Sequence, residues 1–245
     1  MAVFPAQANM FTVKAQDLRY GENSHQQAAW YCDLNPMVGS LATAVQLQVK
    51  ELSYNNIADA DAAWECVKSF EQPACVIVKH ANPCGVAIGA NAQGAYLSAL
   101  QTDPTSAFGG IIAINRLLDQ ATAQEIVKQF VEVVMAPEFS DEALEILRAK
   151  KKGGYNVIQI DPSYRPAEIE RKQVFGVTFE QGRNELNIDE ELLSNFVTKN
   201  KEVPEEALID MKIALITLKY TQSNSVCYVK GGQAIGIGAG QQSRI

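Results

Sequence analysis

A lysine and a histidine stand side by side at Lys79 and His80. They follow the apolar run 74–78, which is typical of a buried strand, and strand ends are where α/β proteins bind ligands. A Pro-Cys-Gly sequence predicts a turn at 83–85. A neutral imidazole beside an ammonium, which opposes its protonation, suits proton transfer near pH 7. The pair also fits a half-buried histidine beside a solvated lysine, because titratable pairs are common.

The bulk composition is that of a globular protein with a substantial core. The chain has 245 residues, of which 47% are hydrophobic and 20% are charged, and its net charge is −7. This balance argues against a nucleic-acid or membrane-surface partner, because no excess of cations is available to neutralise phosphates. No stretch approaches the length of a membrane span. A small anionic ligand needs only a few well-placed cations and stays compatible with this composition.

Cysteine usage predicts a reducing, cytoplasmic location. The cysteines are odd in number, scattered and without a C-x-x-C pair, as expected for small core residues. The first residues lack the basic region and long apolar run of a signal peptide. The five are Cys32, Cys66, Cys75, Cys84 and Cys227.

Zinc chemistry is tested by ligand spacing. A zinc nucleoside deaminase needs His-x-Glu and a later Pro-Cys-x-x-Cys. Pro83-Cys84 is followed by Gly, Val and Ala, so the second cysteine is absent, and neither His25 nor His80 has a glutamate two residues later. Two histidines and scattered cysteines give no metal cage, and we predict no zinc site.

Short apolar runs alternate with helix-like segments along most of the chain. The strand candidates are 74–79, 108–114, 131–135, 155–160, 174–179, 224–229 and 234–237. The helix candidates are 92–100, 119–130 with Asp119 as N-cap, 140–150, 189–196 and a long helix from Pro204. Alternation of this kind favours an α/β layer fold with a mostly parallel sheet.

A change of pattern near 160–190 suggests two subdomains. We expect an extended lead-in over 1–17, a first α/β subdomain over 18–161, a connecting segment over 162–203 and the start of a second subdomain over 204–245. The glycine-rich segment 236–240 reads G-x-G-x-G. It is a weak dinucleotide fingerprint, and a strand edge packed against another backbone explains it better.

Further polar and aromatic residues could contact a ligand. Arg19 suits bidentate phosphate binding and Tyr20 can stack on a base, although a capped surface loop explains both equally. Asn56 precedes or caps a helix, and Phe108 could stack on a ring or pack in the core. Amide and hydroxyl donors around Asn224 could face a developing oxyanion or cap the long helix.

In this order, these segments closely resemble the transformylase half of the bifunctional purine-biosynthesis family that combines AICAR formyltransferase with IMP cyclohydrolase, a transferase and a hydrolase. The resemblance implies a three-layer α/β/α fold, with one cytidine-deaminase-like subdomain followed by part of a second. The matching segments are 19–25, 52–59, 79–85, 103–110, 220–228 and 236–244.

The resemblance implies formyl transfer from 10-formyltetrahydrofolate to AICAR, which gives FAICAR in de novo synthesis of IMP. It implies that Lys79 and His80 are the catalytic pair and that Asn224 contacts the transferring formyl group. Residues implied on the nucleotide side are Arg19, Tyr20, Asn56, Phe108, Gly109, Glu132 and Arg244. Part of a structural potassium site is implied at Leu218, Thr221, Ser223 and Ser225.

The implied mechanism needs no covalent intermediate. Our hypothesis makes His80 the base, lets Lys79 stabilise charge or return a proton to N10 of the folate, and lets Asn224 donate to the oxyanion. Neighbours on a strand point to opposite faces, so Lys79 and His80 converge only if the strand has ended before Pro83.

The family also sets expectations about assembly and completeness. Its members are homodimers with shared active sites, and we expect the same here. The cyclohydrolase region that precedes this segment in the family, and a later Ser-Asp-Ala-Phe-Phe-Pro-Phe-Arg-Asp motif, are not in the sequence. We therefore expect a chain truncated at both ends. The alternative function is a fragment that folds and binds nucleotide without catalysing the reaction.

Overall fold

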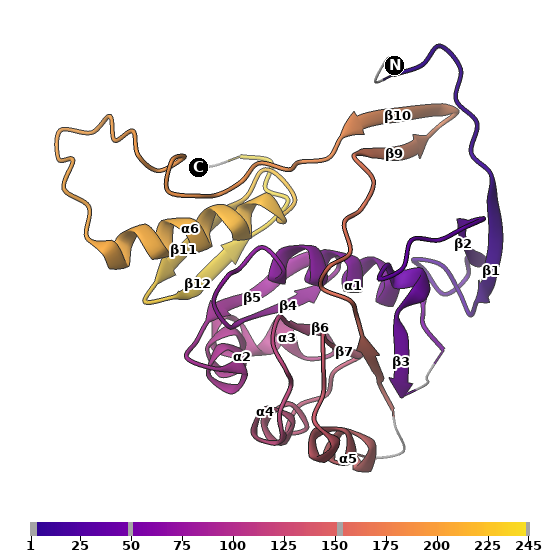
Figure 1. The fold of residues 1–245 in the computed structure, drawn as a ribbon, viewed down its shortest axis with the longest axis horizontal. Helices are drawn as coiled ribbons and strands as arrows, with labels where there is room; N and C mark the ends of the chain where they lie inside the picture. Colours follow the sequence, from indigo (N-terminus) through magenta and orange to yellow (C-terminus); the bar gives the residue numbers. More distant parts are fainter. Residues whose placement is uncertain (1–3, 49–50, 151–153, 244–245) are drawn as a thin grey trace.

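The computed structural model describes residues 4–48, 51–150 and 154–243. Figure 1 shows a central sheet with helices on both faces. The sheet has eight strands in the order β11-β12-β5-β4-β6-β7-β8-β3. They are β3 (Val45–Gln48), β4 (Ala74–Lys79), β5 (Asn82–Ile88), β6 (Ile111–Ile114), β7 (Val133–Ala136), β8 (Asn156–Gln159), β11 (Val226–Lys230) and β12 (Gln233–Gly238).

The helices form the two outer layers. They are α1 (Tyr54–Val67), α2 (Ala92–Thr102), α3 (Pro104–Ala107), α4 (Gln120–Ile126), α5 (Asp141–Ala149) and α6 (Glu205–Lys219), with a 3-10 turn at Leu41–Thr43. Alternate residues of β4 enter different cores because successive strand residues point to opposite faces. Cys75 and Ile77 pack in the core that includes α2, α4 and α5, whereas Val76 and Val78 pack in the core that includes α1 and α6. The expected three-layer α/β/α fold is confirmed.

The prediction of a mostly parallel sheet is wrong. Only β6, β7 and β8 are parallel neighbours, and the other pairs of the sheet are antiparallel. The main cause is a reversal directly after β4: His80 and Ala81 adopt φ of 55° and 58° and form a two-residue turn into β5. Left-handed backbone at both central residues is the geometry of a tight hairpin turn.

The predicted turn at 83–85 is also wrong, because these residues lie inside β5. Pro83 opposes Val78 at a shift in the β4–β5 register, where the hydrogen-bonded ladder is irregular; a residue without an N–H is tolerated at such a position. Gly85 is needed for close approach rather than for a turn. A Cβ there would lie 2.2 Å from the carbonyl oxygen of Ala99 on α2.

Most predicted helices are confirmed, with shifted ends. Asp119 is the N-cap of α4 and accepts a hydrogen bond from the N–H of Thr122, and Ser140 caps α5 in the same way. The helix predicted at 189–196 is wrong: Asp189 accepts a hydrogen bond from the N–H of Leu192, but only a turn follows. Its residues are exposed or half-buried, and a short helix without packing is marginal in water.

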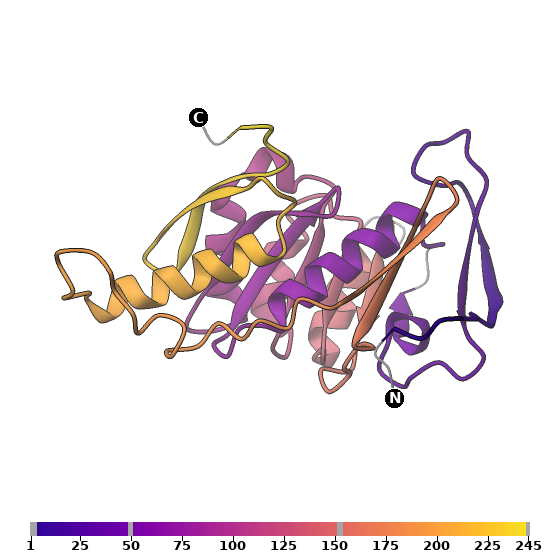
Figure 2. The ribbon, with the colours of Figure 1, turned by 90° about the horizontal axis from the view of Figure 1, so that it is seen from above.

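The strand predicted at 174–179 is wrong because it spans a turn. Phe175 and Gly176, with φ of 40° and 81°, reverse the chain between β9 (Ile169–Val174) and β10 (Val177–Gly182). A second separate hairpin is formed by β1 (Thr12–Leu18) and β2 (Ala28–Asp33). Figure 2 shows the β1–β2 hairpin standing to one side of the layers.

The C-terminal hairpin was predicted correctly and completes the central sheet. β11 and β12 pair across the turn at Gly231 and Gly232, and β12 pairs with β5. Ile213 and Ile216 of α6 share a core with α1. Residues on both sides of the expected subdomain boundary thus belong to one sheet, and the division of the chain into subdomains stays a prediction.

The close approach of α2 to β5 gives a stability test. Gly85→Ala should lower the free energy of unfolding by about 1–3 kcal/mol, because the added methyl meets a backbone carbonyl that cannot move aside. Gly94→Ala is the matched control: its Cβ would lie 3.4 Å from a side-chain atom of Asn91, an ordinary contact. Urea unfolding of both variants measures the difference, and equal stabilities would contradict this account of Gly85.

Candidate functional site

The candidate site lies at the sheet edge where β4 ends and β5, β6 and β7 begin. We call it the turn edge and define it by 79–82, 108–110 and Glu132. The Nζ of Lys79 donates to the carbonyl oxygen of Phe108 at 2.6 Å, and the N–H of Glu132 donates to the carbonyl of Gly110 at 3.0 Å. In open parallel sheets, ligands bind outside the carboxyl ends of the strands. The turn edge differs, because it is the carboxyl end of β4 but the amino end of β5 to β8.

The reversal after β4 is held by a side chain that sequence reasoning missed. Asp59 of α1 is buried, and its carboxylate accepts hydrogen bonds from the N–H of His80 at 3.2 Å and the N–H of Ala81 at 2.6 Å. Burial raises the pKa of Asp59, and the two backbone hydrogen bonds oppose this shift. The sequence offered one signal for a functional role of Asp59: it lies three residues after Asn56, so the two are neighbours on the surface of one helix.

Asn82 ties the same turn to the segment that carries Asn224. Its Nδ2 donates to the carbonyl oxygen of His80 at 2.9 Å, and its Oδ1 accepts from the N–H of Gln222 at 2.9 Å. The carbonyl of Asn224 in turn accepts from the N–H of Gln241 at 2.9 Å. The structure therefore brings the end of α6 and the glycine-rich segment after β12 to the turn edge.

A cavity of about 370 Å³ opens beside the turn, a size that suits a small ligand. Lys79 and His80 both line it, with His80 in the turn and Pro83 in the next strand, and the catalytic role of the pair stays a prediction. Asp103 adds a carboxylate. The hydroxyl of Ser106 lowers the pKa of Asp103. The remaining lining residues are Asn82, Pro83, Cys84, Thr102, Ser106, Gly236, Ile237 and Ala239.

Arg19 and Tyr20 form a pair at the surface. The guanidinium donates to the Tyr20 hydroxyl at 3.1 Å and lies 4.8 Å from the ring centroid. The Tyr20 hydroxyl raises the pKa of Arg19, and the carboxylates of Glu51 and Glu132 add to the effect. Neither Arg19 nor Tyr20 lines the cavity beside Lys79.

The residues between α3 and β6 present an aromatic ring to solvent. Phe108 is 58% exposed, which excludes core packing, and its ring centroid lies 5.3 Å from that of Phe130. Gly109 has a φ of 74°, and its N–H donates to the carbonyl oxygen of Phe130 at 2.8 Å. An exposed ring of this kind can stack on a ligand ring.

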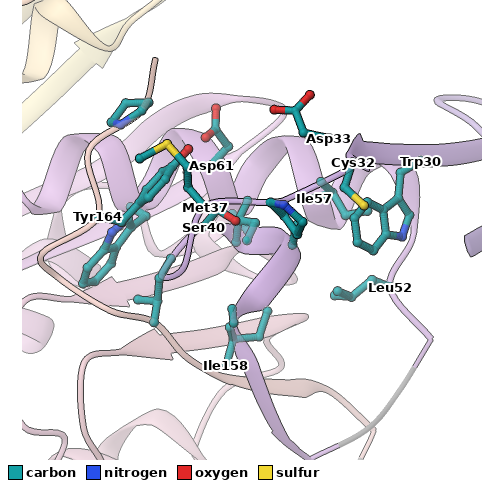
Figure 3. Close-up of a pocket in the computed structure, with 18 of the residues that line it drawn as sticks. Trp30, Cys32, Asp33, Met37, Ser40, Leu52, Ile57, Asp61, Ile158 and Tyr164 are labelled. Carbon is teal, nitrogen blue, oxygen red and sulfur yellow. The ribbon is translucent and has the colours of Figure 1, made fainter. Parts of the chain in front are cut away.

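Asn56 caps the start of α1 and does not line the cavity beside Lys79. Its Oδ1 accepts the N–H of Ser53 at 3.1 Å, and the Ser53 hydroxyl accepts the N–H of Asn56, so the two form a capping box. Asn56 also lines a larger cavity of about 540 Å³ that Lys79 and His80 do not line. Figure 3 shows this second cavity, in which Trp30 of β2, Ile57 of α1 and Tyr164 approach from different elements.

The residues expected at a potassium site follow the end of α6. The Thr221 hydroxyl donates to the carbonyl of Thr217 at 2.6 Å, and the Thr221 N–H donates to the carbonyl of Leu218 at 3.2 Å. Ser223 is exposed and Ser225 half-buried. Among the residues that the structure describes, no cluster of His, Cys, Asp or Glu could hold a metal ion. Arg244 lies outside the described residues.

The structure is a mixed α/β/α fold with a cavity beside the turn that follows β4. The sequence matches the family described as AICARFT/IMPCHase bienzyme over residues 2–245, and the chain belongs to that family. A solved structure, Acinetobacter baumannii RibD, form 1, is similar over 41% of this chain and only 32% of its own length, with 23% sequence identity and a TM-score of 0.29. In the described ranges, no helix has both the length and the apolar character needed to cross a membrane.

Two aspartates of this region should respond to pH in opposite directions. The pKa of Asp59 is raised by burial, so its ionisation lowers stability as the pH rises from about 4 through the raised value. The pKa of Asp103 is lowered by Ser106, so stability from Asp103 is lost as the pH falls below about 4.

Urea unfolding between pH 3 and pH 7 tests these signs. Relative to wild type, Asp59→Asn should gain stability as the pH rises above about 4, while Asp103→Asn should lose stability between pH 3 and about 4 and then stay constant. Parallel pH profiles for the two variants would contradict the assignment.

Proposed function

We propose that this chain carries the formyl-transfer site of its family and makes FAICAR from AICAR and 10-formyltetrahydrofolate. The family supports a role in purine biosynthesis. The proposal of formyl transfer rests on one observation: Lys79 and His80 line the same cavity, and Asn82 beside them is hydrogen-bonded to the segment that leads to Asn224.

The reaction sets clear demands on the site. The amine of AICAR is a weak nucleophile because its electrons are conjugated with an electron-poor imidazole and a carboxamide. Its nitrogen attacks the formyl carbon, a tetrahedral oxyanion forms, and the bond from that carbon to N10 of the folate breaks. The amine loses one proton and N10 gains one, so proton transfer and oxyanion stabilisation are the two tasks of the protein.

The turn edge supplies groups for both tasks. His80 is exposed at the cavity and takes the proton from the amine. Lys79, fixed by its bond to the Phe108 carbonyl, stabilises charge or returns a proton to N10. Asn224 donates to the oxyanion through its side-chain amide. The chemistry is carried by side chains and folate and requires no zinc.

The nucleotide occupies the outer part of the turn edge in this proposal. Arg19 binds the phosphate, the exposed ring of Phe108 stacks on the base, and Glu132 accepts from the ribose. The positive φ of Gly109 and the half-buried Tyr20 shape the same surface. Asn56 and Arg244 belong to this set by family resemblance alone.

The region after α6 suits potassium in its donor chemistry. Thr221, Ser223 and Ser225 offer hydroxyl oxygens and Leu218 a carbonyl oxygen, which are the hard donors that such cations take. The carbonyl ends of a helix also favour positive charge. A potassium ion there would fix the segment that carries Asn224.

We also propose that the protein works in the cytoplasm as a homodimer with shared active sites. The separate hairpins support association because they expose apolar side chains, including Tyr31, Phe175 and Phe179. The five free cysteines suit a reducing compartment. The partners are small molecules rather than nucleic acid or membrane, in keeping with the net charge of −7.

Replacing His80 with alanine in the full-length protein tests the proposal. Turnover in a formyl-transfer assay should fall about 100-fold or more, because the general base is lost. AICAR affinity, measured by calorimetry, should change less than about threefold, since binding contacts lie elsewhere. Near-normal turnover would rule out His80 as the base. Binding of AICAR by a wild-type protein without turnover would instead support the alternative, a nucleotide-binding fragment.

A further inference from the structure

We propose that Asp59 and Asn82 are positioning residues of this site, which together hold the His80–Ala81 turn so that Lys79 and His80 enter their shared cavity. The inference rests on the proposed function. It assigns to two side chains, neither of which needs to touch the reacting atoms, the geometry on which the proton transfer depends.

The turn is the unusual one among the tight hairpins of the described structure. The β9–β10 turn has one glycine and the β11–β12 turn has two, whereas His80 and Ala81 both take left-handed φ values with a Cβ present. Left-handed backbone is unfavourable for such residues, and strain of this kind concentrates at functional sites. Glycine would relieve the strain at position 80, but it would remove the imidazole from the cavity. The surroundings must therefore hold the turn.

Asp59 fixes the turn from the face of the sheet that α1 covers. Both N–H groups of the turn donate to its carboxylate, at 3.2 Å and 2.6 Å, so one rigid side chain fixes two successive peptide units. Asp59 is buried on α1, and α1 packs against β4 through the shared core, so the anchor cannot shift freely. Charge-assisted hydrogen bonds of this type are stronger than neutral ones.

Asn82 is the second residue that fixes the turn, and it also connects the turn to the segment after α6. Its amide donates to the carbonyl of His80 and accepts from the N–H of Gln222, so the turn and the segment leading to Asn224 share one side chain. This link restrains the turn of the proposed base relative to the segment of the proposed oxyanion donor. Misplacement of reacting groups by about 1 Å can lower rates about a hundredfold.

The chain offers a matched control at the opposite sheet edge. Asp210 accepts hydrogen bonds from the N–H groups of Gly231 and Gly232 at 2.9 Å and 2.8 Å, the same contact made to a turn that lines no part of the cavity. If holding a turn matters only for folding, Asp59→Asn and Asp210→Asn should behave alike in a formyl-transfer assay.

Steady-state kinetics of the full-length enzyme test the proposal. Asp59→Asn should lower kcat about 10- to 100-fold while KM for AICAR changes less than about threefold, and Asp210→Asn should leave kcat within about twofold. Adding Ala81→Gly to Asp59→Asn should restore at least about a third of the lost activity on a logarithmic scale, because glycine adopts the left-handed turn without strain.

Asn82→Ala keeps the test decisive if Asp59→Asn does not fold. It should lower kcat with KM nearly constant, since it separates the turn from the Asn224 segment. The proposal is overturned if the folded Asp59 and Asn82 variants keep kcat within about twofold of wild type, or if Asp210→Asn loses as much as Asp59→Asn. His80→Ala and the wild-type enzyme, run alongside, separate the claims. Absence of formyl transfer by the wild-type enzyme removes the proposed function, and full activity of His80→Ala removes His80 as the base. Loss of activity in His80→Ala with active Asp59 and Asn82 variants removes only the positioning role.

Discussion

The site depends on one interaction, the acceptance of two backbone N–H groups by the buried carboxylate of Asp59. This contact supports an abrupt reversal of β4 into β5 at His80 and Ala81, which have no glycine to ease it. Because the chain reverses there, β5 is antiparallel to β4, and the turn that carries His80 lies at the edge where β6 and β7 begin. The same contact therefore supports both the antiparallel direction of β5 and the position of the proposed catalytic pair.

The electrostatics of the turn edge are more balanced than a lysine–histidine pair alone suggests. Lys79 brings an ammonium to the cavity and Asp103 brings a carboxylate to it, while Asp59 places a second carboxylate against the backbone of the turn. In the proposed reaction, the nucleotide phosphate and the folate would both add negative charge to this mixture of charged groups.

Much of the fold was predictable because its signals are local. The apolar run 74–79 and the caps at Asp119 and Ser140 each define an element from a few neighbouring residues. The errors arise where distant contacts decide. His80-Ala81 lacks the Asn-Gly pattern of a hairpin turn, and its stability comes from a helix 21 residues earlier in the chain. Asp189 has a good cap but no packing surface, so no helix follows. Lys79 and His80 were candidates from the sequence and their role stays a prediction, whereas the role of Asp59 in the turn is seen from its contacts.

Helix α1 carries residues that act at two different cavities. Its first turn carries Asn56, which lines the larger cavity between β2 and Tyr164, and its second turn carries Asp59, which holds the reversal beside the smaller one. Residues three apart lie on neighbouring positions of one helix surface, so a rigid shift of α1 would move both. The core packing of Trp64 and Val67 against the sheet resists such a shift. The geometry of the proposed catalytic pair therefore rests on the packing of a helix that also lines the larger cavity.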